Sequence, residues 1–259
     1  MTRTPISRRT LLSAGGLLLL SGCSDSGATH ASAPARPTTE PTMMPGDSHR
    51  GGTPQPGAAG KRPTTQAPEF YVEDGSRAIA LTIDDGPDPQ WTPQVLDLLG
   101  RYGITATFCQ VGIRAAADPA LVHAVADHGH LVANHTWTHA DLAAATPAGV
   151  REQLERTSDM IESISGQRPR LFRAPYGAWT QSTFAACRAL GMRPLDWSVD
   201  PRDWARPGVS RIAQTILRTT RPGSIILEHD GGGDRSQTLS ALRIVLPRLL
   251  DAGYHFVTP

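Results

Sequence analysis

Residues 78–89 read AIALTIDDGPDP, a short apolar run that ends in two adjacent carboxylates, Asp84 and Asp85. A run of this length next to turn-forming residues is typical of a β-strand buried inside a sheet. Like charges at such short range raise each other's pKa unless something positive neutralises them. The stretch therefore predicts a buried strand that delivers two carboxylates to a bound cation.

Apolar runs of the same kind recur along the chain, and helical patterns separate them. The predicted strands cover residues 78–83, 106–111, 130–133, 170–173, 194–199, 224–228 and 255–258. Strands that alternate with helices imply parallel pairing through right-handed crossovers. Seven such strands favour an α/β fold, either a barrel one βα unit short of eight or a doubly wound open sheet.

Prolines mark several predicted helix ends. Three helices are expected to begin with a capping residue followed by proline at the first helical position: Thr92 with Pro93, Asp118 with Pro119, and Thr146 with Pro147. Pro247 interrupts the last helical run. Because a proline inside a helix removes a hydrogen bond, we expect a kink there or a late helix start.

Two histidines, His135 and His139, follow the third predicted strand and lie four residues apart. One helical turn at this spacing would place both imidazoles on the same face. Two histidines with one aspartate suit Zn²⁺, Co²⁺ or Fe²⁺ and leave coordination positions open for water and substrate. Such an open site activates water and polarises a carbonyl, as hydrolysis requires. Three further histidines match no chemical motif and are expected to be structural: His123, His128 and His130.

Three more polar motifs end predicted strands. RAPYG covers residues 173–177, DPRDW covers 200–204, and LEHD covers 227–230. Each motif alone is also compatible with a surface turn that carries a salt bridge. In a parallel barrel, however, the C-terminal ends of the strands converge on one face. We therefore expect all five motifs to meet there.

The motifs LTIDDGPDP, NHTWTH, FRAPYG, DPRDW and ILEHD resemble, in order and spacing, those of the polysaccharide deacetylases, the NodB-like domain of carbohydrate esterase family four. The similarity spans residues 77–259. It implies a distorted barrel of seven or eight βα units. It also implies one divalent metal ion, zinc in the first place with cobalt or nickel as alternatives, held by Asp85, His135 and His139.

The same resemblance implies roles for the remaining motif residues. Asp84 would be the general base and His229 the general acid that protonates the leaving nitrogen. Arg173 would hold Asp84 ionised, and Asp203 would orient the imidazole of His229. The acetyl methyl group would lie against Trp204 and Leu227, and the backbone N–H of Tyr176 would stabilise the oxyanion.

These residue types suit hydrolysis of an N-acetyl group, and the resemblance implies a metal-dependent hydrolase that removes such groups from a β-1,4-linked amino-sugar polysaccharide. Peptidoglycan N-acetylglucosamine is the favoured substrate because the anchor and tether described below would place the enzyme beside the cell wall. A chitooligosaccharide deacetylase and an acetylxylan esterase are the alternatives within the family. An inactive carbohydrate-binding domain is the alternative from another class. The presence of both Asp84 and His229 disfavours it. A metal-dependent phosphoesterase is weaker still, because such sites usually need more acidic ligands for two metals.

Residues 1–23 have the layout of a bacterial export signal. Arg8 and Arg9 precede an apolar run over 11–20, which is too short to cross a bilayer, and the pair resembles a twin-arginine signal. General secretion is the alternative. The residues LSGC at 20–23 resemble a lipobox, which implies a lipid on Cys23, and an ordinary cleavage site is the alternative. We expect an exported protein anchored on the outer face of the cytoplasmic membrane.

Residues 24–68 contain eight prolines, six glycines and no Ile, Leu, Val or aromatic residue, which predicts a disordered linker. The catalytic domain is expected over 69–259, where 18 arginines face 21 acidic residues. This acidic balance argues against nucleic-acid binding. We expect a monomer whose partner is the acetylated polysaccharide. Cys109 and Cys187 are expected to be separate buried thiols, and a disulfide between them is the alternative for an exported protein.

Overall fold

The computed structural model describes residues 67–259, so the predicted signal, Cys23 and nearly all of the predicted linker lie outside the described residues. The strands are β1 (Ala78–Asp84), β2 (Thr107–Gln110), β3 (Leu131–Asn134), β4 (Leu171–Phe172), β5 (Arg193–Pro194), β6 (Ile225–His229) and β7 (His255–Phe256). The α-helices are α1 (Thr92–Tyr102), α2 (Gly112–Ala117), α3 (Pro119–Asp127), α4 (Pro147–Ser165), α5 (Gln181–Ala189), α6 (Val209–Thr219) and α7 (Ser236–Asp251). Short 3₁₀ helices are η1 (Leu142–Ala144), η2 (Pro175–Gly177) and η3 (Asp203–Ala205).

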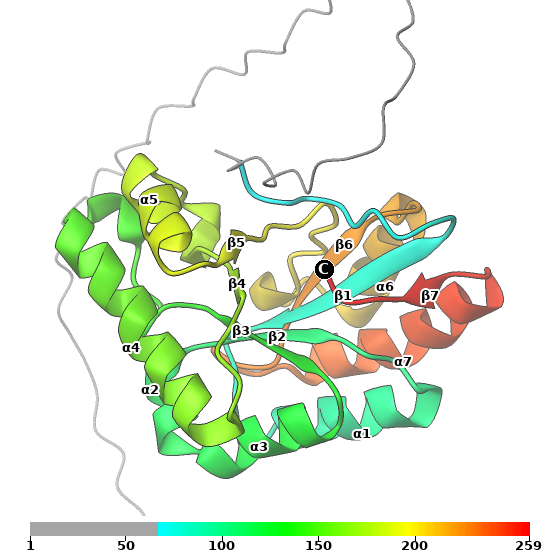
Figure 1. Ribbon diagram of the computed structural model, residues 1–259. Helices are drawn as coiled ribbons and strands as arrows, with labels where there is room; N and C mark the ends of the chain where they lie inside the picture. The colour runs from blue at the N-terminus through cyan, green and yellow to red at the C-terminus, as the bar shows by residue number, and fades with distance from the viewer. Residues whose placement is uncertain (1–66) are drawn as a thin grey trace, which may run out of the picture. The chain divides into compact units, whose positions relative to one another are not determined.

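The strands form one parallel sheet in the order β5-β4-β3-β2-β1-β6, and β7 pairs with one end of β1. Every strand pair is parallel, as the alternation of strands and helices predicted. The sheet curls, and the α-helices lie along its outer side (Figure 1). The predicted distorted barrel of seven βα units is confirmed. Within residues 67–259, no helix combines the length and apolar character that a membrane span needs.

Strand β1 is buried along its whole length. Its side chains alternate, so Ile79, Leu81 and Ile83 join the core between the sheet and the helices, while the intervening positions face the inside of the curl. Large aliphatic groups therefore hold the strand against α1 and α7. The inner positions, Thr82 and Asp84 among them, are free for polar chemistry.

The sheet would be open between its outer strands, β5 and β6, but two segments close the seam. Residues after β5 bond to β6 through the N–H of Leu227, which donates to the carbonyl of Val199 over 2.9 Å. Near the start of strand β6, residues 69–72 form a strap across the gap between β5 and β6. The N–H of Glu69 donates to Pro194 at 2.9 Å, and the N–H of Val72 donates to Gly223 at 2.8 Å. The strap ties the start of the domain to both edges of the barrel.

Two of the three predicted helix caps are confirmed. The side chain of Asp118 accepts a hydrogen bond from the backbone of Leu121, and that of Thr146 accepts one from Gly149. The prediction for Thr92 is wrong, since Trp91 is the N-cap and Thr92 is already helical. Its hydroxyl is used elsewhere, because it donates to the buried carboxylate of Asp230 over 2.6 Å.

Of the two outcomes expected at Pro247, a kink or a late helix start, the late start is wrong. Helix α7 begins at Ser236 and continues through Pro247. The proline removes a hydrogen bond, but Val245, Leu246 and Leu249 are packed in the core on both sides of it. Burial of these side chains outweighs the missing bond, so the helix is not interrupted.

Cys109 and Cys187 are free and buried, as predicted. His130 is structural too: its Nδ1 accepts a hydrogen bond from the backbone N–H of Ala106 over 3.2 Å. Burial lowers the pKa of His130 to about 4, so its imidazole is neutral at physiological pH. These groups contribute packing and leave the chemistry to the strand ends.

Candidate active site

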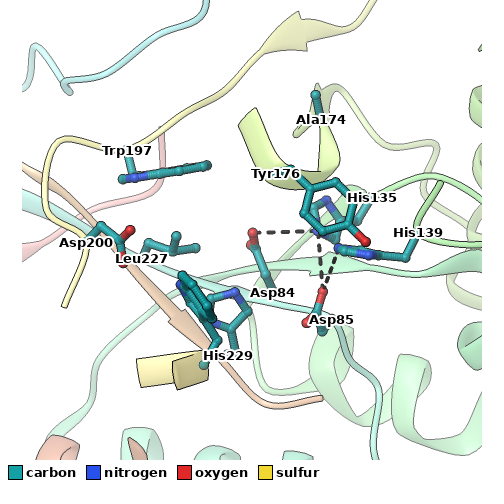
Figure 2. A pocket seen from close by; sticks show the side chains of 11 residues that line it. Asp84, Asp85, His135, His139, Ala174, Tyr176, Trp197, Asp200, Leu227 and His229 are labelled. Carbon is teal, nitrogen blue, oxygen red and sulfur yellow. Dashed lines mark ion pairs between the residues drawn. The ribbon is translucent and has the colours of Figure 1, made fainter. Parts of the chain in front are cut away.

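The five motifs converge on one cavity of about 360 Å³ at the carboxyl ends of the strands. Figure 2 shows the carboxylates and imidazoles of the motifs facing one another inside it. Eight of the ten residues that the sequence singled out in the domain line the cavity: Asp84, Asp85, His135, His139, Tyr176, Trp204, Leu227 and His229. The other two, Arg173 and Asp203, are buried directly behind the lining.

A carboxylate oxygen and two imidazole nitrogens form a compact cluster in the cavity (Figure 2). Oδ1 of Asp85 lies 3.1 Å from Nε2 of His139 and 3.5 Å from Nε2 of His135. The three atoms all lie within 4.8 Å of one another. Within residues 67–259, no hydrogen-bond donor satisfies this buried oxygen. The arrangement has the residue types and spacing of a metal site with three protein ligands.

The tautomer of His135 supports the same interpretation. Its Nδ1 lies 2.9 Å from the backbone carbonyl of Arg173, to which it can only donate. In the neutral ring, Nε2 then carries a lone pair aimed at the carboxylate of Asp85. A divalent metal between these facing lone pairs would neutralise them, and the residue types present fit one. Burial alone would raise the pKa of Asp85, but His135 and His139 outweigh it and hold that pKa far below its usual range.

The two histidines do not lie on a helical turn, so that part of the prediction is wrong. Residues 135–139 form a loop, in which Thr136 has φ 68° and His139 has φ 57°. Helix α2 holds this loop, because the N–H of Gly112 donates to the carbonyl of Thr136 over 2.9 Å. Two left-handed residues turn the chain back on itself, and the imidazoles converge through the loop instead of a helix face.

Left-handed backbone is concentrated at these strand ends. Seven described residues other than glycine have positive φ, and six of them belong to the loops that follow β1, β3, β4 and β5: Asp85, Thr136, His139, Tyr176, Arg202 and Arg206. This conformation is strained for a residue with a Cβ atom. The site is therefore built on backbone that is locally unfavourable.

Asp84 is held by a fully buried guanidinium. Nη1 of Arg173 donates to Oδ1 of Asp84 over 2.8 Å and to the hydroxyl of Thr82 over 2.7 Å. Nη2 donates to the backbone carbonyl of Asp196 over 2.8 Å. Burial opposes the charge on Arg173, but Asp84 outweighs it and raises the pKa of the guanidinium. The geometry keeps Asp84 fixed beside the ligand cluster, where its other oxygen lies 3.7 Å from Nε2 of His135.

From the adjacent strand β6, His229 also lines the cavity and is held by Asp203. Nδ1 of His229 lies 2.7 Å from Oδ1 of Asp203, while Oδ2 accepts the backbone N–H of His229 at 3.0 Å and the hydroxyl of Thr238 at 2.7 Å. Burial lowers the pKa of His229, but the hydrogen bond and charge of Asp203 outweigh it and raise that pKa to about 9. A protonated imidazole thus lines the same cavity as the carboxylate of Asp84.

Sequence reasoning missed three residues that shape the site. Trp197 and Asp200 line the cavity, and Thr238 supports Asp203 from helix α7. Asp200 stands in the DPRDW motif, so its position was a usable signal. Trp197 and Thr238 carried no such signal, because nothing in their local sequence indicates which wall they would meet.

A sequence profile described as "Polysaccharide deacetylase" matches residues 71–195. A chitooligosaccharide deacetylase of Bradyrhizobium sp. (strain ANU 289) is 45% identical over 192 residues, which cover 70% of this chain and 88% of the relative. A peptidoglycan-N-acetylglucosamine deacetylase of Bacillus cereus is 41% identical over 191 residues, covering 73% of this chain and 89% of the relative.

Solved structures show the same fold. The Bc1960 peptidoglycan N-acetylglucosamine deacetylase aligns with a TM-score of 0.71 at 33% identity, covering 73% of this chain and 89% of that one. A pseudoenzyme of carbohydrate esterase family four from Bacillus anthracis aligns with a TM-score of 0.70 at 27% identity, covering 75% of this chain and 68% of that one. The chain belongs to the polysaccharide deacetylase family. The metal dependence of this family agrees with the ligand cluster of Asp85, His135 and His139.

Proposed function

We propose that the protein hydrolyses N-acetyl groups of peptidoglycan N-acetylglucosamine, with zinc held by Asp85, His135 and His139. Fold alone does not carry the activity, because one structural neighbour is described as a pseudoenzyme. The observation that carries the proposal is the intact pair of polar groups that line the cavity beside the ligand cluster. Asp84 is held by Arg173, and His229 is held by Asp203.

A divalent cation bound by the three ligands supplies a Lewis acid for the amide carbonyl and lowers the pKa of water. Asp84 accepts the proton of the attacking water, because Arg173 holds its carboxylate in place. His229 is protonated and faces the same cavity, so it donates the proton that the leaving nitrogen needs. The two groups thereby divide the work of base and acid.

The remaining lining suits a small acyl group. Leu227 and Trp204 provide apolar surface in the cavity, where they would contact the acetyl methyl. The backbone of Tyr176 turns with φ 61° at the cavity wall, and its N–H would donate to the developing oxyanion. Cobalt or nickel would satisfy the same ligand set, and zinc is proposed first because two imidazoles and one carboxylate match its preference.

The names of the relatives offer two classes of substrate for this protein, peptidoglycan and chitooligosaccharides. We favour peptidoglycan because residues 1–23 and 24–68 have the sequence of a lipoprotein signal and a tether, which would hold the domain beside the cell wall. Chitooligosaccharides and acetylxylan remain the second candidates. Acetate release from all three substrates by the zinc-loaded protein discriminates among them.

The decisive comparison is the wild type against Asp84→Asn, which keeps the shape of the side chain and removes its charge. We expect release from peptidoglycan by the wild type and a loss of at least about 100-fold in the variant, since general base catalysis contributes about 10²–10⁴-fold. No release from any substrate by the wild type would reject the enzymatic proposal. Equal rates in the two proteins would instead reject Asp84 as the base.

The anchoring is a separate proposal with its own test. Labelled fatty acid should be incorporated into the full chain expressed in a bacterium, and Cys23→Ser should abolish the incorporation and release the protein from the membrane fraction. Arg8→Lys with Arg9→Lys should block export if the twin-arginine route is used. Export of that double variant at the wild-type level would assign the chain to general secretion.

A further inference from the structure

A buried acid, Glu228, lies next to the proposed catalytic pair and has no role in the mechanism above. Strand β6 alternates, so Leu227 and His229 line the cavity while Glu228 points to the opposite side with Ile226. Ile226 belongs to the hydrophobic core that packs under the helices. Glu228 therefore occupies a position at which the fold calls for an apolar side chain, and it is fully buried there.

The polar surroundings of Glu228 are dominated by another acid. Within residues 67–259, neither of its carboxyl oxygens has an assigned hydrogen-bond partner, and its main acidic neighbour is Asp203, whose Oδ2 accepts the N–H of the next residue, His229, over 3.0 Å. The charges of Asp200, in the loop after β5, and of Arg235, at the start of α7, also act on Glu228. The Nε–H of Arg235 donates to the carbonyl of Gly231 over 2.6 Å, and within residues 67–259 no hydrogen bond joins Arg235 to the carboxyl of Glu228.

The charges decide the protonation state. Asp203 is the ionised member, because it already accepts three hydrogen bonds, two from His229 and one from Thr238. A second buried anion beside it would be unpaired and strongly disfavoured. Burial, and then the negative charge of Asp203, raise the pKa of Glu228 well above its usual value. A protonated carboxyl has one donor, and Asp203 is the acceptor next to it.

We propose that Glu228 is a positioning residue: its carboxyl stays protonated and donates a hydrogen bond to Asp203. This hydrogen bond weakens the interaction of Asp203 with the imidazolium of His229. The inference rests on the proposed function, in which His229 is the general acid. Sharing the charge of Asp203 with a fourth donor makes Asp203 a weaker base. The imidazolium of His229 then releases its proton to the leaving nitrogen more readily.

The sign of the effect on His229 separates this state from an ionised Glu228. Glu228→Leu removes a donor without removing a charge, so Asp203 binds the imidazolium more strongly and the pKa of His229 should rise. If Glu228 were ionised, the same substitution would remove a negative charge and the pKa would fall. Glu228→Gln keeps a neutral donor and should leave the pKa unchanged, whereas loss of an ionised Glu228 would lower it.

The test is a histidine NMR titration of the zinc-loaded protein in the wild type, Glu228→Leu and Glu228→Gln. Thr238→Val is the matched control, because it removes another neutral donor from the same carboxylate. Charges that act on His229 from elsewhere, those of Asp84 and Asp85, are the same in all four proteins. We expect Glu228→Leu and Thr238→Val each to raise the pKa of His229 by about 0.5 unit, a change in acidity of about threefold.

A lowered or unchanged pKa in Glu228→Leu would overturn the proposal. So would a lowered pKa in Glu228→Gln, which decides the matter even if the leucine variant fails to fold. The infrared carbonyl band of a protonated acid should be present in the wild type and reduced in Glu228→Gln. Because the titration needs no turnover, absence of acetate release would reject the proposed function while the coupling of Glu228 to His229 would still be measured.

Discussion

Replacing Asp203 by asparagine should restrict the action of His229 as a general acid to low pH, whereas in the wild type His229 stays protonated up to alkaline pH. The amide oxygen of the substituted side chain can still accept from the hydroxyl of Thr238 and the N–H of His229, so the fold is expected to persist. The amide nitrogen would face Nδ1 of His229, where a carboxylate now lies at 2.7 Å. The group that stabilises the imidazolium is thereby removed.

The magnitude follows from the pKa of His229, which Asp203 raises to about 9 against burial. Without that carboxylate the pKa should fall to its unperturbed value of about 6.5 or lower. At pH 8 the protonated fraction then falls from about 90% to about 3%, which predicts a rate loss of about 30-fold from population alone. The loss should shrink toward pH 6, where both proteins are protonated.

The assay is acetate release by the zinc-loaded proteins between pH 6 and 10, with kcat measured at each pH. Asp234→Asn is the control, because it removes the same charge from an exposed residue and leaves the contacts of His229 untouched. The alkaline limb of Asp203→Asn should move down by about 2.5 units while that of the control stays in place. A loss that is the same at every pH would refute the assignment of His229 as an acid tuned by Asp203.

Three further outcomes are expected. Arg173→Met removes the guanidinium that holds the buried Asp84, so urea denaturation of the metal-free protein should show a free energy of unfolding lower by about 3–5 kcal/mol. Arg173→Lys should recover less than half of this difference, because one ammonium cannot make all three hydrogen bonds of the guanidinium. Wild-type stability of either variant would contradict this expectation. Asp85→Asn should weaken zinc binding in calorimetry by more than about 100-fold, beyond the effect usual for outer-shell partners, and unchanged affinity would exclude Asp85 as a ligand. A chain that begins at residue 75 lacks the strap over 69–72 and its three backbone hydrogen bonds to the barrel edges. Its Tm should therefore lie about 6–12 °C below that of a chain beginning at residue 67. Equal Tm values would show that the seam closes without the strap.

The convergence of the site was predictable because of one geometric property of parallel sheets. Their strands all end on the same edge, so polar residues that directly follow apolar runs must meet there. Asp84 and His229 are 145 positions apart in the chain, yet they are paired residues of adjacent strands β1 and β6. Recognising each strand end was enough to place both walls of the cavity.

Other features depend on packing that leaves no periodic trace. The loop of residues 135–139 has the spacing of a helical turn, and only its left-handed residues show that it is not one. Thr92 is a residue type that is favoured at helix N-caps, but its hydroxyl donates a hydrogen bond to the buried carboxylate of Asp230, which is distant in sequence. The strap over 69–72 forms hydrogen bonds with residues more than 120 positions away, and its own sequence contains no signal that predicts these partners.

The left-handed residues around the cavity bear on how such a site persists through evolution. Two of the proposed ligands, Asp85 and His139, stand in backbone that glycine would adopt at lower energy, at a cost of about 1 kcal/mol or more each. Selection for folding alone would therefore favour their replacement, and a lineage released from catalysis would drift toward a more stable chain with an eroded ligand set. In this chain the set of Asp85, His135 and His139 is complete, although two of its three members carry that cost.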